Sequence, residues 1–145
     1  MVEDRKRREI EEDCHRLMVD FANEVDLFNY DAVLAMFIPD CIFMHGEKVF
    51  EGRGQILELL QARRRNRRTR HVVSNMVVRV VDETHATGKS YCLVFGYLGE
   101  LPDDEPAPLS APDSLVEFED DFTATDEGWK IARRRLRFVF DKEEP

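Results

Sequence analysis

The chain has 145 residues, of which 43% are hydrophobic and 35% are charged, so it can form one domain with one hydrophobic core. This composition excludes disorder as a description of the whole chain. Asp and Glu number 30 against 21 Lys and Arg, and the net charge of -9 disfavours general binding to nucleic acids or anionic membranes. We therefore expect a single domain over residues 1–145 with neither kind of partner.

No apolar run approaches the roughly 20 residues of a membrane span, and the first residues lack the apolar core of a secretory signal. These features predict a cytoplasmic protein. The three cysteines, Cys14, Cys41 and Cys92, are widely spaced and each lies in an apolar stretch. Such spacing is typical of buried free thiols and unlike that of a disulfide framework or a metal knuckle.

The first half of the chain predicts three helices and a short hairpin. Apolar residues recur at helical spacing along the first helix, Pro39 marks the end of the second, and Gly46 marks the hairpin turn. The expected helices are Glu3 to Phe28, Asn29 to Phe37 and Gly52 to Arg64, and the expected strands are Cys41 to His45 and Lys48 to Phe50.

The second half predicts four long strands rich in Val, Phe and Tyr, separated by polar turns. They are Arg70 to Val81, Ala86 to Leu98, Leu115 to Thr125 and Trp129 to Phe140. Helices followed by meandering strands predict an α+β fold: a cone-shaped, barrel-like curved antiparallel sheet with three helices over one face and an internal pocket. The segment at 99–113 holds four prolines, so we expect a mobile loop there, with a lid over the pocket as a hypothesis.

A basic run lies between the third helix and the first long strand. It could indicate a nucleic-acid patch, but within an acidic chain we interpret it as solvated arginines near a helix C-terminus. Its members are Arg63, Arg64, Arg65, Arg67, Arg68 and Arg70.

The sequence lacks glycine-rich nucleotide motifs, GxSxG and HExxH, so we expect acid-base chemistry without a cofactor or a metal. The two-residue period of a strand places His71, Val73, Asn75 and Val77 on one face. Asp26 lies at the last turn of the first helix, where the helix dipole disfavours an anion and burial would require a partner. Asp26 could orient His71 as a general base, or the two could be a solvated acid and a core histidine.

Two further groups of side chains could line the pocket. His45 shares a strand face with Phe43, although it could equally be a half-exposed histidine at a turn. The aromatic row that contains Tyr91 and Phe95 could line the pocket or pack in the core.

Three segments, ANEVDLFNYDAVLAMFIPDCIF, RTRHVVSNMVVRV and FTATDEGWKIARRRLRF, occur in an order that resembles the SnoaL-like branch of the nuclear transport factor 2-like superfamily. The resemblance covers roughly Cys14 to Phe140. It places Asp26 and His71 at the Asp-His dyad of scytalone dehydratase and hexachlorocyclohexane dehydrochlorinase. It places His45 at a substrate-binding Tyr of the dehydratase and at the general-base Asp of ketosteroid isomerase.

The resemblance implies a cofactor-free lyase or isomerase for a small hydrophobic, cyclic or aromatic molecule. Asp26 would orient His71, which would remove a proton from carbon, while His45 and Asn75 would hold oxygens. The implied pocket-lining residues are Val25, Phe21, Phe43, Val73, Tyr91 and Phe95.

The sequence also departs from these relatives. Gly96 replaces the second catalytic His of the dehydratase, Val25 the Tyr before its Asp, and Phe21 the oxyanion Tyr of the isomerase. The segment RTRHVVSN is also similar to small subunits of aromatic-ring-hydroxylating dioxygenases, so a noncatalytic subunit or ligand-binding module is the alternative. We expect a homodimer or homotrimer, because helices on one face would leave a face with Val72, Met76, Val78 and Val80 uncovered.

Overall fold

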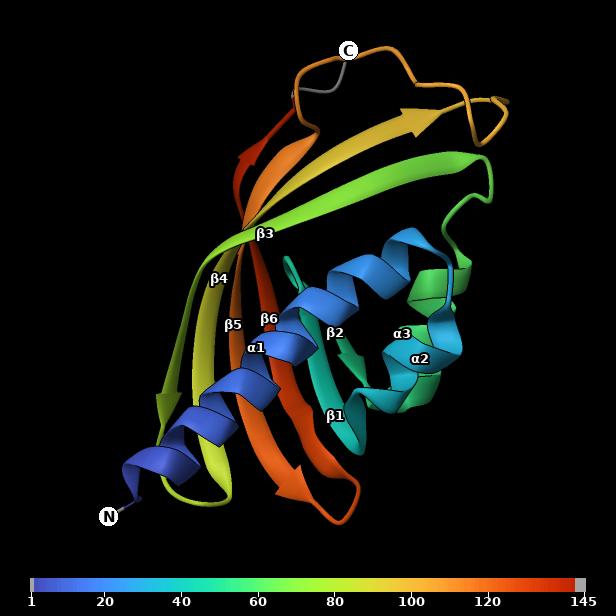
Figure 1. Cartoon of the computed structure of the whole chain (residues 1–145). Helices are drawn as coiled ribbons and strands as arrows, with labels where there is room; N and C mark the ends of the chain where they lie inside the picture. The colour runs from blue at the N-terminus through green and yellow to red at the C-terminus, as the bar shows by residue number, and fades with distance from the viewer. Residues whose placement is uncertain (1, 143–145) are drawn as a thin grey trace.

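The structure, a computed structural model, describes residues 2–142 and contains three helices and six strands (Figure 1). The helices are α1 (Asp4–Asp26), α2 (Tyr30–Ala35) and α3 (Gly52–Gln61). The strands are β1 (Phe37–His45), β2 (Lys48–Glu51), β3 (Arg67–Val80), β4 (His85–Leu98), β5 (Ser114–Thr125) and β6 (Gly128–Asp141). No helix among these residues is long and apolar enough to cross a membrane.

The six strands form one curved sheet in the order β2-β1-β6-β5-β4-β3. Neighbouring strands are antiparallel except β1 and β6, which are parallel. The sheet does not close, and α1 runs diagonally across one face while α2 and α3 lie beside β1 and β2 (Figure 1). The α+β architecture predicted from the sequence is therefore confirmed.

The core lies between α1 and the sheet face that it covers, called here the inner face. Along β5 the side chains alternate between buried Val116, Phe118 and Phe122 and outward-facing charged residues, as a half-buried strand requires. All three cysteines are buried and free, as predicted. Burial raises the pKa of Cys14 to about 12 and that of Cys92 to about 11, so neither thiol is poised to ionise.

A β-bulge in β3 changes the faces expected from the sequence. The register to β4 shifts between Ser74 and Val77, and Asn75 adopts a positive φ of 52°. His71 and Val73 remain on the inner face, whereas Asn75 and Val77 are exposed. The expectation that all four share one face was wrong because the bulge adds a residue and inverts the alternation.

The same bulge turns Met76, Val78 and Val80 toward the core, where they pack against buried residues. The expectation that these three residues remain uncovered together with Val72 is therefore wrong. Val72 itself faces outward and is 48% exposed.

The loop between β4 and β5 folds toward the opposite, outer face of the sheet. Arg68 donates hydrogen bonds to the carbonyl oxygens of Pro102 and Glu105, which hold the loop there. Residues 107–110 lie over Phe95 and Tyr97, and together they line an open cavity of about 340 Å³. This part of the loop covers the outer face, so it is not a lid over His71.

Candidate functional site

The C-terminus of α1 fixes the position of Asp26, the last residue of the helix. The chain turns there because Phe28 adopts a left-handed φ of 57°, its N–H donates to the carbonyl of Val25, and the N–H of Asn29 donates to that of Glu24. These two bonds form a Schellman motif, which normally has glycine at the left-handed position. The motif ends the helix where Asp26 faces β3.

Asp26 and His71 are joined by two hydrogen bonds. Nδ1 of His71 lies 2.6 Å from Oδ1 of Asp26, and the backbone N–H of His71 donates to Oδ2 at 3.0 Å. The hydroxyl of Thr69 lies 2.8 Å from Oδ1. The side chains of Asp26 and His71 are only 7% and 16% exposed, so the contact is shielded from solvent.

These contacts determine the charge of Asp26. Burial would raise the pKa of Asp26, but hydrogen bonds from the side chain and backbone of His71, with a further one from Thr69, lower it below its ordinary value. An ionised carboxylate only accepts hydrogen bonds, so Nδ1 of His71 must donate its proton. In the neutral imidazole, Nε2 then carries the lone pair, and it has no hydrogen-bond partner among residues 2–142.

Arg63 is bound to the same group of side chains, Asp26, His71 and Thr69, through its contact with Thr69. The interpretation of the basic run as solvated arginines is therefore wrong for Arg63. Its guanidinium donates to the carbonyl of Val25 at 2.8 Å, to the hydroxyl of Tyr30 at 3.2 Å and to the hydroxyl of Thr69 at 2.9 Å. The cation therefore neutralises the negative end of α1, where Asp26 would otherwise be destabilised. Arg67 and Arg68 also make contacts, to the Asp113 carboxylate and to the loop carbonyls.

Several predicted pocket residues instead form part of the apolar core on the inner face. Phe21, Val25 and Phe43 are buried, and Val73 packs against the same core. The rings of Phe21 and Phe43 have centroids 6.1 Å apart.

His45 lies at the end of β1, on the same face as Phe43. Its ring stacks on Phe43 and meets the edge of Phe138 at centroid distances of 6.1 and 5.6 Å. Burial lowers the pKa of His45, so the ring tends to remain neutral.

The structure does not bring Asn75, Tyr91 and Phe95 to Asp26 and His71. Asn75 projects to solvent at the bulge. Tyr91 pairs with Ser74 and Phe95 with Arg70, which are outward positions of β3, so both aromatic side chains lie on the outer face. Strand alternation correctly places Tyr91 and Phe95 on one face of β4. Whether that face is also the face of His71 depends on the pairing of β3 with β4.

Gly96 pairs with Thr69 and therefore lies beside the cluster. A side chain at this position would collide with the carboxylate of Asp113. That carboxylate lies 3.6 Å from Arg67 and 3.0 Å from Lys142. The carboxylate of Asp113, just before β5, thus fills the space next to Gly96. At this position the resemblance to scytalone dehydratase predicts the second catalytic His of that enzyme.

A buried ion pair lies deeper on the inner face and was not predicted. Nε of Arg134 on β6 lies 3.0 Å from Oδ1 of Asp120 on β5, and both side chains are 0% exposed. The guanidinium carbon lies 4.3 Å from the centroid of Phe21 and 3.6 Å from that of Phe118. The sequence did contain a signal for Asp120. In a strand with a two-residue period, Asp120 lies on the same face as Phe118 and Phe122, which predicts that it is buried.

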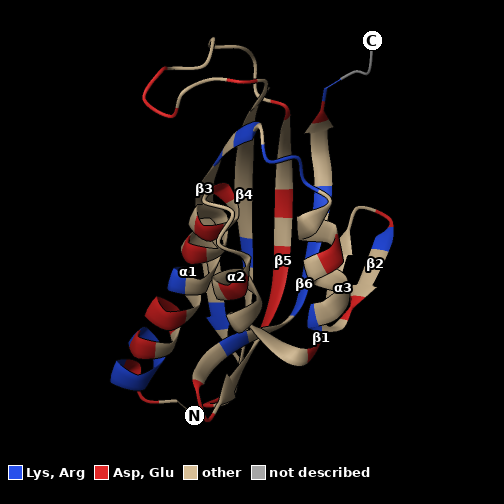
Figure 2. Cartoon of the chain, turned by 90° about the vertical axis from the view of Figure 1, so that its right-hand side faces the viewer, with Lys and Arg blue, Asp and Glu red and all other residues tan. Residues whose placement is uncertain are grey.

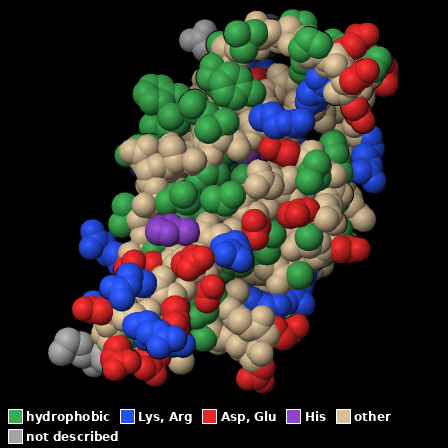
Figure 3. Space-filling model, viewed as in Figure 1, with side chains coloured by type: hydrophobic (Ala, Val, Ile, Leu, Met, Phe, Trp, Pro, Cys, Tyr) green, Lys and Arg blue, Asp and Glu red, His purple; other side chains and the backbone are tan. Residues whose placement is uncertain are grey.

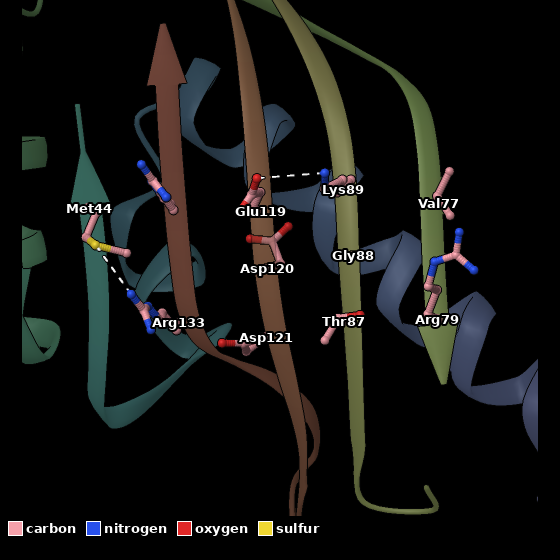
Figure 4. Close-up of a pocket in the computed structure, with 11 residues that line it drawn as sticks. Met44, Val77, Arg79, Thr87, Gly88, Lys89, Glu119, Asp120, Asp121 and Arg133 are labelled. Atoms are coloured by element: carbon pink, nitrogen blue, oxygen red, sulfur yellow. Dashed lines mark hydrogen bonds and ion pairs between the residues drawn. The ribbon is translucent and has the colours of Figure 1, made fainter. Parts of the chain in front are cut away.

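The larger cavity, about 520 Å³, lies on the outer face across β1, β6, β5, β4 and β3 (Figure 4). Charged side chains of both signs line it, including Arg79, Lys89, Glu119, Asp121 and Arg133. Neither this cavity nor the one under the loop is lined by Asp26 or His71. Within residues 2–142, no three His, Cys, Asp or Glu side chains lie together in a way that could hold a metal ion.

Comparison with solved structures finds the same fold in proteins of several kinds. A candidate scytalone dehydratase from Novosphingobium aromaticivorans is 22% identical, with a TM-score of 0.79 over 99% of this chain and 94% of that one. A type 2 hexachlorocyclohexane dehydrochlorinase is 16% identical, with a TM-score of 0.78 over 99% and 94%. A protein of unknown function from Mycobacterium tuberculosis is 26% identical, with a TM-score of 0.73 over 86% and 73%.

No curated protein matches the sequence. The model of the SnoaL-like domain matches residues 6–135, which is most of the chain and includes Asp26, His71, Asp120 and Arg134. The chain therefore belongs to the SnoaL-like domain family of the nuclear transport factor 2-like superfamily.

Proposed function

We propose that this protein is a cofactor-independent lyase, of the dehydratase or dehydrohalogenase kind, in which His71 is the general base and Asp26 orients it. The observation that carries the proposal is the 2.6 Å contact between Nδ1 of His71 and Oδ1 of Asp26. It leaves Nε2 free to accept a proton. The names of two structural neighbours, a candidate dehydratase and a dehydrochlorinase, support an elimination reaction.

The proposed reaction needs no external oxidant or reductant. Nε2 of His71 takes a proton from a substrate carbon, and the C–H electron pair forms a C=C bond. The bond to the leaving group on the adjacent carbon breaks, and that group departs as chloride, or as water once it has taken a proton. Asp26 stabilises the imidazolium that forms. Return of the proton to another carbon would make the enzyme an isomerase instead.

The proposed substrate is a small hydrophobic, cyclic or aromatic molecule. Phe21, Val25 and Phe43 are packed in the core on the face that carries His71, so the surroundings of the proposed base on this face are apolar. His45 stacks on Phe43 at the end of this apolar region, and burial lowers its pKa, which favours a neutral ring that can donate one hydrogen bond to a substrate oxygen. Turnover of a panel of hydroxylated and halogenated ring compounds tests this substrate class.

Asp26→Asn is expected to reduce turnover of such a substrate by about 100-fold or more, because the amide cannot stabilise the imidazolium. Stability should fall by about 1–3 kcal/mol at pH 7, since an amide nitrogen would face donors that the carboxylate accepts. The pKa of Asp26 is lowered in the folded state. The stabilisation is therefore present above the ordinary Asp pKa and is lost as the pH falls through the folded value.

Urea unfolding at pH 7 and pH 3 measures this dependence. The stability difference between wild type and Asp26→Asn should be smaller at pH 3. Asp31→Asn, an exposed acid on the first turn of α2, is the control and should change neither turnover nor stability. An Asp26→Asn variant with full turnover would contradict the role of the carboxylate.

We also propose that the chain forms a homodimer or homotrimer through the outer face of the sheet. Among residues 2–142 no helix covers this face, where Val72, Tyr91 and Phe140 are 48%, 42% and 70% exposed. Figure 3, which views the molecule from the side of α1, shows a further group of hydrophobic side chains on the upper left, beyond the helices. The outer face also carries acidic residues on β5 beside basic residues on β6, which a second copy could match (Figure 2).

Light scattering at micromolar concentration is expected to give the mass of a dimer or trimer. Tyr91→Lys should shift the protein toward a monomer, because it buries a charge in the contact. Val19→Lys changes an exposed residue of α1, on the opposite side of the sheet, and should leave the mass unchanged. A monomeric wild type would refute the proposal.

A further inference from the structure

We propose that the buried pair of Asp120 and Arg134 is the part of the inner face that recognises a hydroxyl group on the substrate ring. The inference rests on the proposed function, because it names a substituent that the substrate of that reaction carries. It assigns a binding role to two side chains on β5 and β6, which are different strands from the one that holds His71.

The pair has more hydrogen-bonding capacity than its neighbours satisfy. Nε of Arg134 lies 3.0 Å from Oδ1 of Asp120, but neither the three guanidinium nitrogens nor the two carboxylate oxygens have a hydrogen-bond partner among residues 2–142. Even an ideal bidentate pair would use two of the five N–H donors of an arginine, and three would remain. Buried polar groups are normally hydrogen-bonded, and leaving them unpaired costs free energy. We therefore expect an additional polar group at this position.

The surroundings of the pair favour one kind of polar group. The guanidinium carbon of Arg134 lies 4.3 Å and 3.6 Å from the ring centroids of Phe21 and Phe118, which attract the cation but accept no conventional hydrogen bond. The charges of Asp120 and Arg134 balance, so a charged substituent would leave a net charge buried. A hydroxyl is neutral, and it can accept from the guanidinium and donate to the carboxylate, whereas a carbonyl can only accept.

The pair is close enough to His71 for one small ring to reach both. Phe21, which lies against the guanidinium, precedes Asp26 by five residues on α1, which is about 7.5 Å along a helix. The thiol of Cys92 is in range of both places: burial is the main cause of its raised pKa, Arg134 opposes the rise and Asp26 adds to it. A six-membered ring can thus present a carbon to His71 and a hydroxyl to the pair. Because Asp120 and Arg134 are 0% exposed, the ring reaches them only when core side chains move.

Binding of phenol, anisole and toluene tests this inference without any need for turnover. The three probes are similar in size, but only phenol can both donate and accept a hydrogen bond. At pH 8 the carboxyl of Asp120, with its pKa of about 6, is ionised and accepts. We expect phenol to bind the wild-type protein with a Kd about 10- to 100-fold lower than that of toluene, the range for a hydrogen bond to a charged group, with anisole between them.

The double variant Asp120→Leu with Arg134→Met replaces the pair by apolar volume, so it should reduce the preference for phenol over toluene by about 10-fold or more. His71→Ala should keep the preference, which separates the pair from the proposed base. Arg135→Met, an exposed neighbour on β6, is the matched control and should also keep it. Wild-type protein that binds phenol no better than toluene, or a double variant that keeps the full preference, would overturn the inference.

A direct measurement serves if the double variant does not fold. The side-chain Nε–H resonance of Arg134 in the wild type should shift when phenol is added and stay in place with toluene. Equal shifts with both probes, or none with phenol, would show that the pair does not bind the hydroxyl. Neither measurement depends on turnover, so failure of the proposed reaction would remain distinguishable from failure of this inference.

Discussion

Replacement of His71 by alanine is expected to reduce turnover by about 100-fold or more, the range lost when a positioned general base is removed. His71 provides the only imidazole joined to Asp26 among residues 2–142, and its Nε2 is unpartnered. Alanine removes this acceptor but keeps the backbone N–H that donates to Oδ2 of Asp26. The hydroxyl of Thr69 also remains on Oδ1, so the carboxylate keeps two of its three donors and the domain should fold.

The matched control is His85→Ala, which removes an exposed histidine at the start of β4. It should leave turnover unchanged, and circular dichroism should show folded protein for both variants. Full activity in both His71→Ala and Asp26→Asn would refute the elimination mechanism. The noncatalytic ligand-binding module, or a small subunit of a ring-hydroxylating dioxygenase, would then explain the domain better.

The long strands could be predicted to within about three residues because period-two alternation and polar turns are local signals. The strand predicted from Arg70 to Val81 is Arg67–Val80, and the helix predicted from Glu3 to Phe28 is Asp4–Asp26. The second helix was predicted two residues too long, because Phe37 pairs with Ile131 and begins β1 instead. Local sequence thus predicts whether a segment is a helix or a strand, whereas pairing with distant strands determines the residues at which the segment begins and ends.

The candidate site could be predicted only in part. Thr69 lies one residue before the strand predicted from Arg70, and extending the alternation of that strand by one residue would have placed it on the face of His71. Arg63 had none, because its contacts come from three segments that the fold alone brings together. The position of Asn75 depended on a bulge that no glycine or proline marks in SNMV. Long-range pairing, not residue type, determined these differences.

Arg134→Met is expected to destabilise the domain by about 3–5 kcal/mol at pH 7, because it leaves the Asp120 carboxylate buried without a partner. Both side chains are 0% exposed, and their contact at 3.0 Å lacks good hydrogen-bond geometry. Burial raises the pKa of Asp120 to about 6 although Arg134 lowers it, and burial lowers the pKa of Arg134. Burial thus opposes the charged form of both groups, and buried pairs of this kind often stabilise a domain less than apolar side chains of similar volume.

The double variant Asp120→Leu with Arg134→Met should accordingly recover most of this loss, or exceed the wild type, since it replaces two desolvated charges by apolar volume. Urea unfolding of both variants measures the difference, and Arg135→Met, on the outward side of β6, should stay within about 0.5 kcal/mol of wild type. A double variant less stable than Arg134→Met alone would show that the pair stabilises the core.

The pH dependence gives an independent check on the same pair. The folded pKa of Asp120, about 6, is above the ordinary value of 3.8, so the folded state binds the proton more tightly. The contribution of Asp120 to stability is therefore greatest below pH 4 and declines as the pH rises toward 6. Loss of Arg134 removes the group that lowers this pKa, so the carboxyl should stay neutral to higher pH. The penalty of Arg134→Met should then be smaller at pH 5 than at pH 7, and an equal penalty at both would mean that Asp120 remains ionised in the variant.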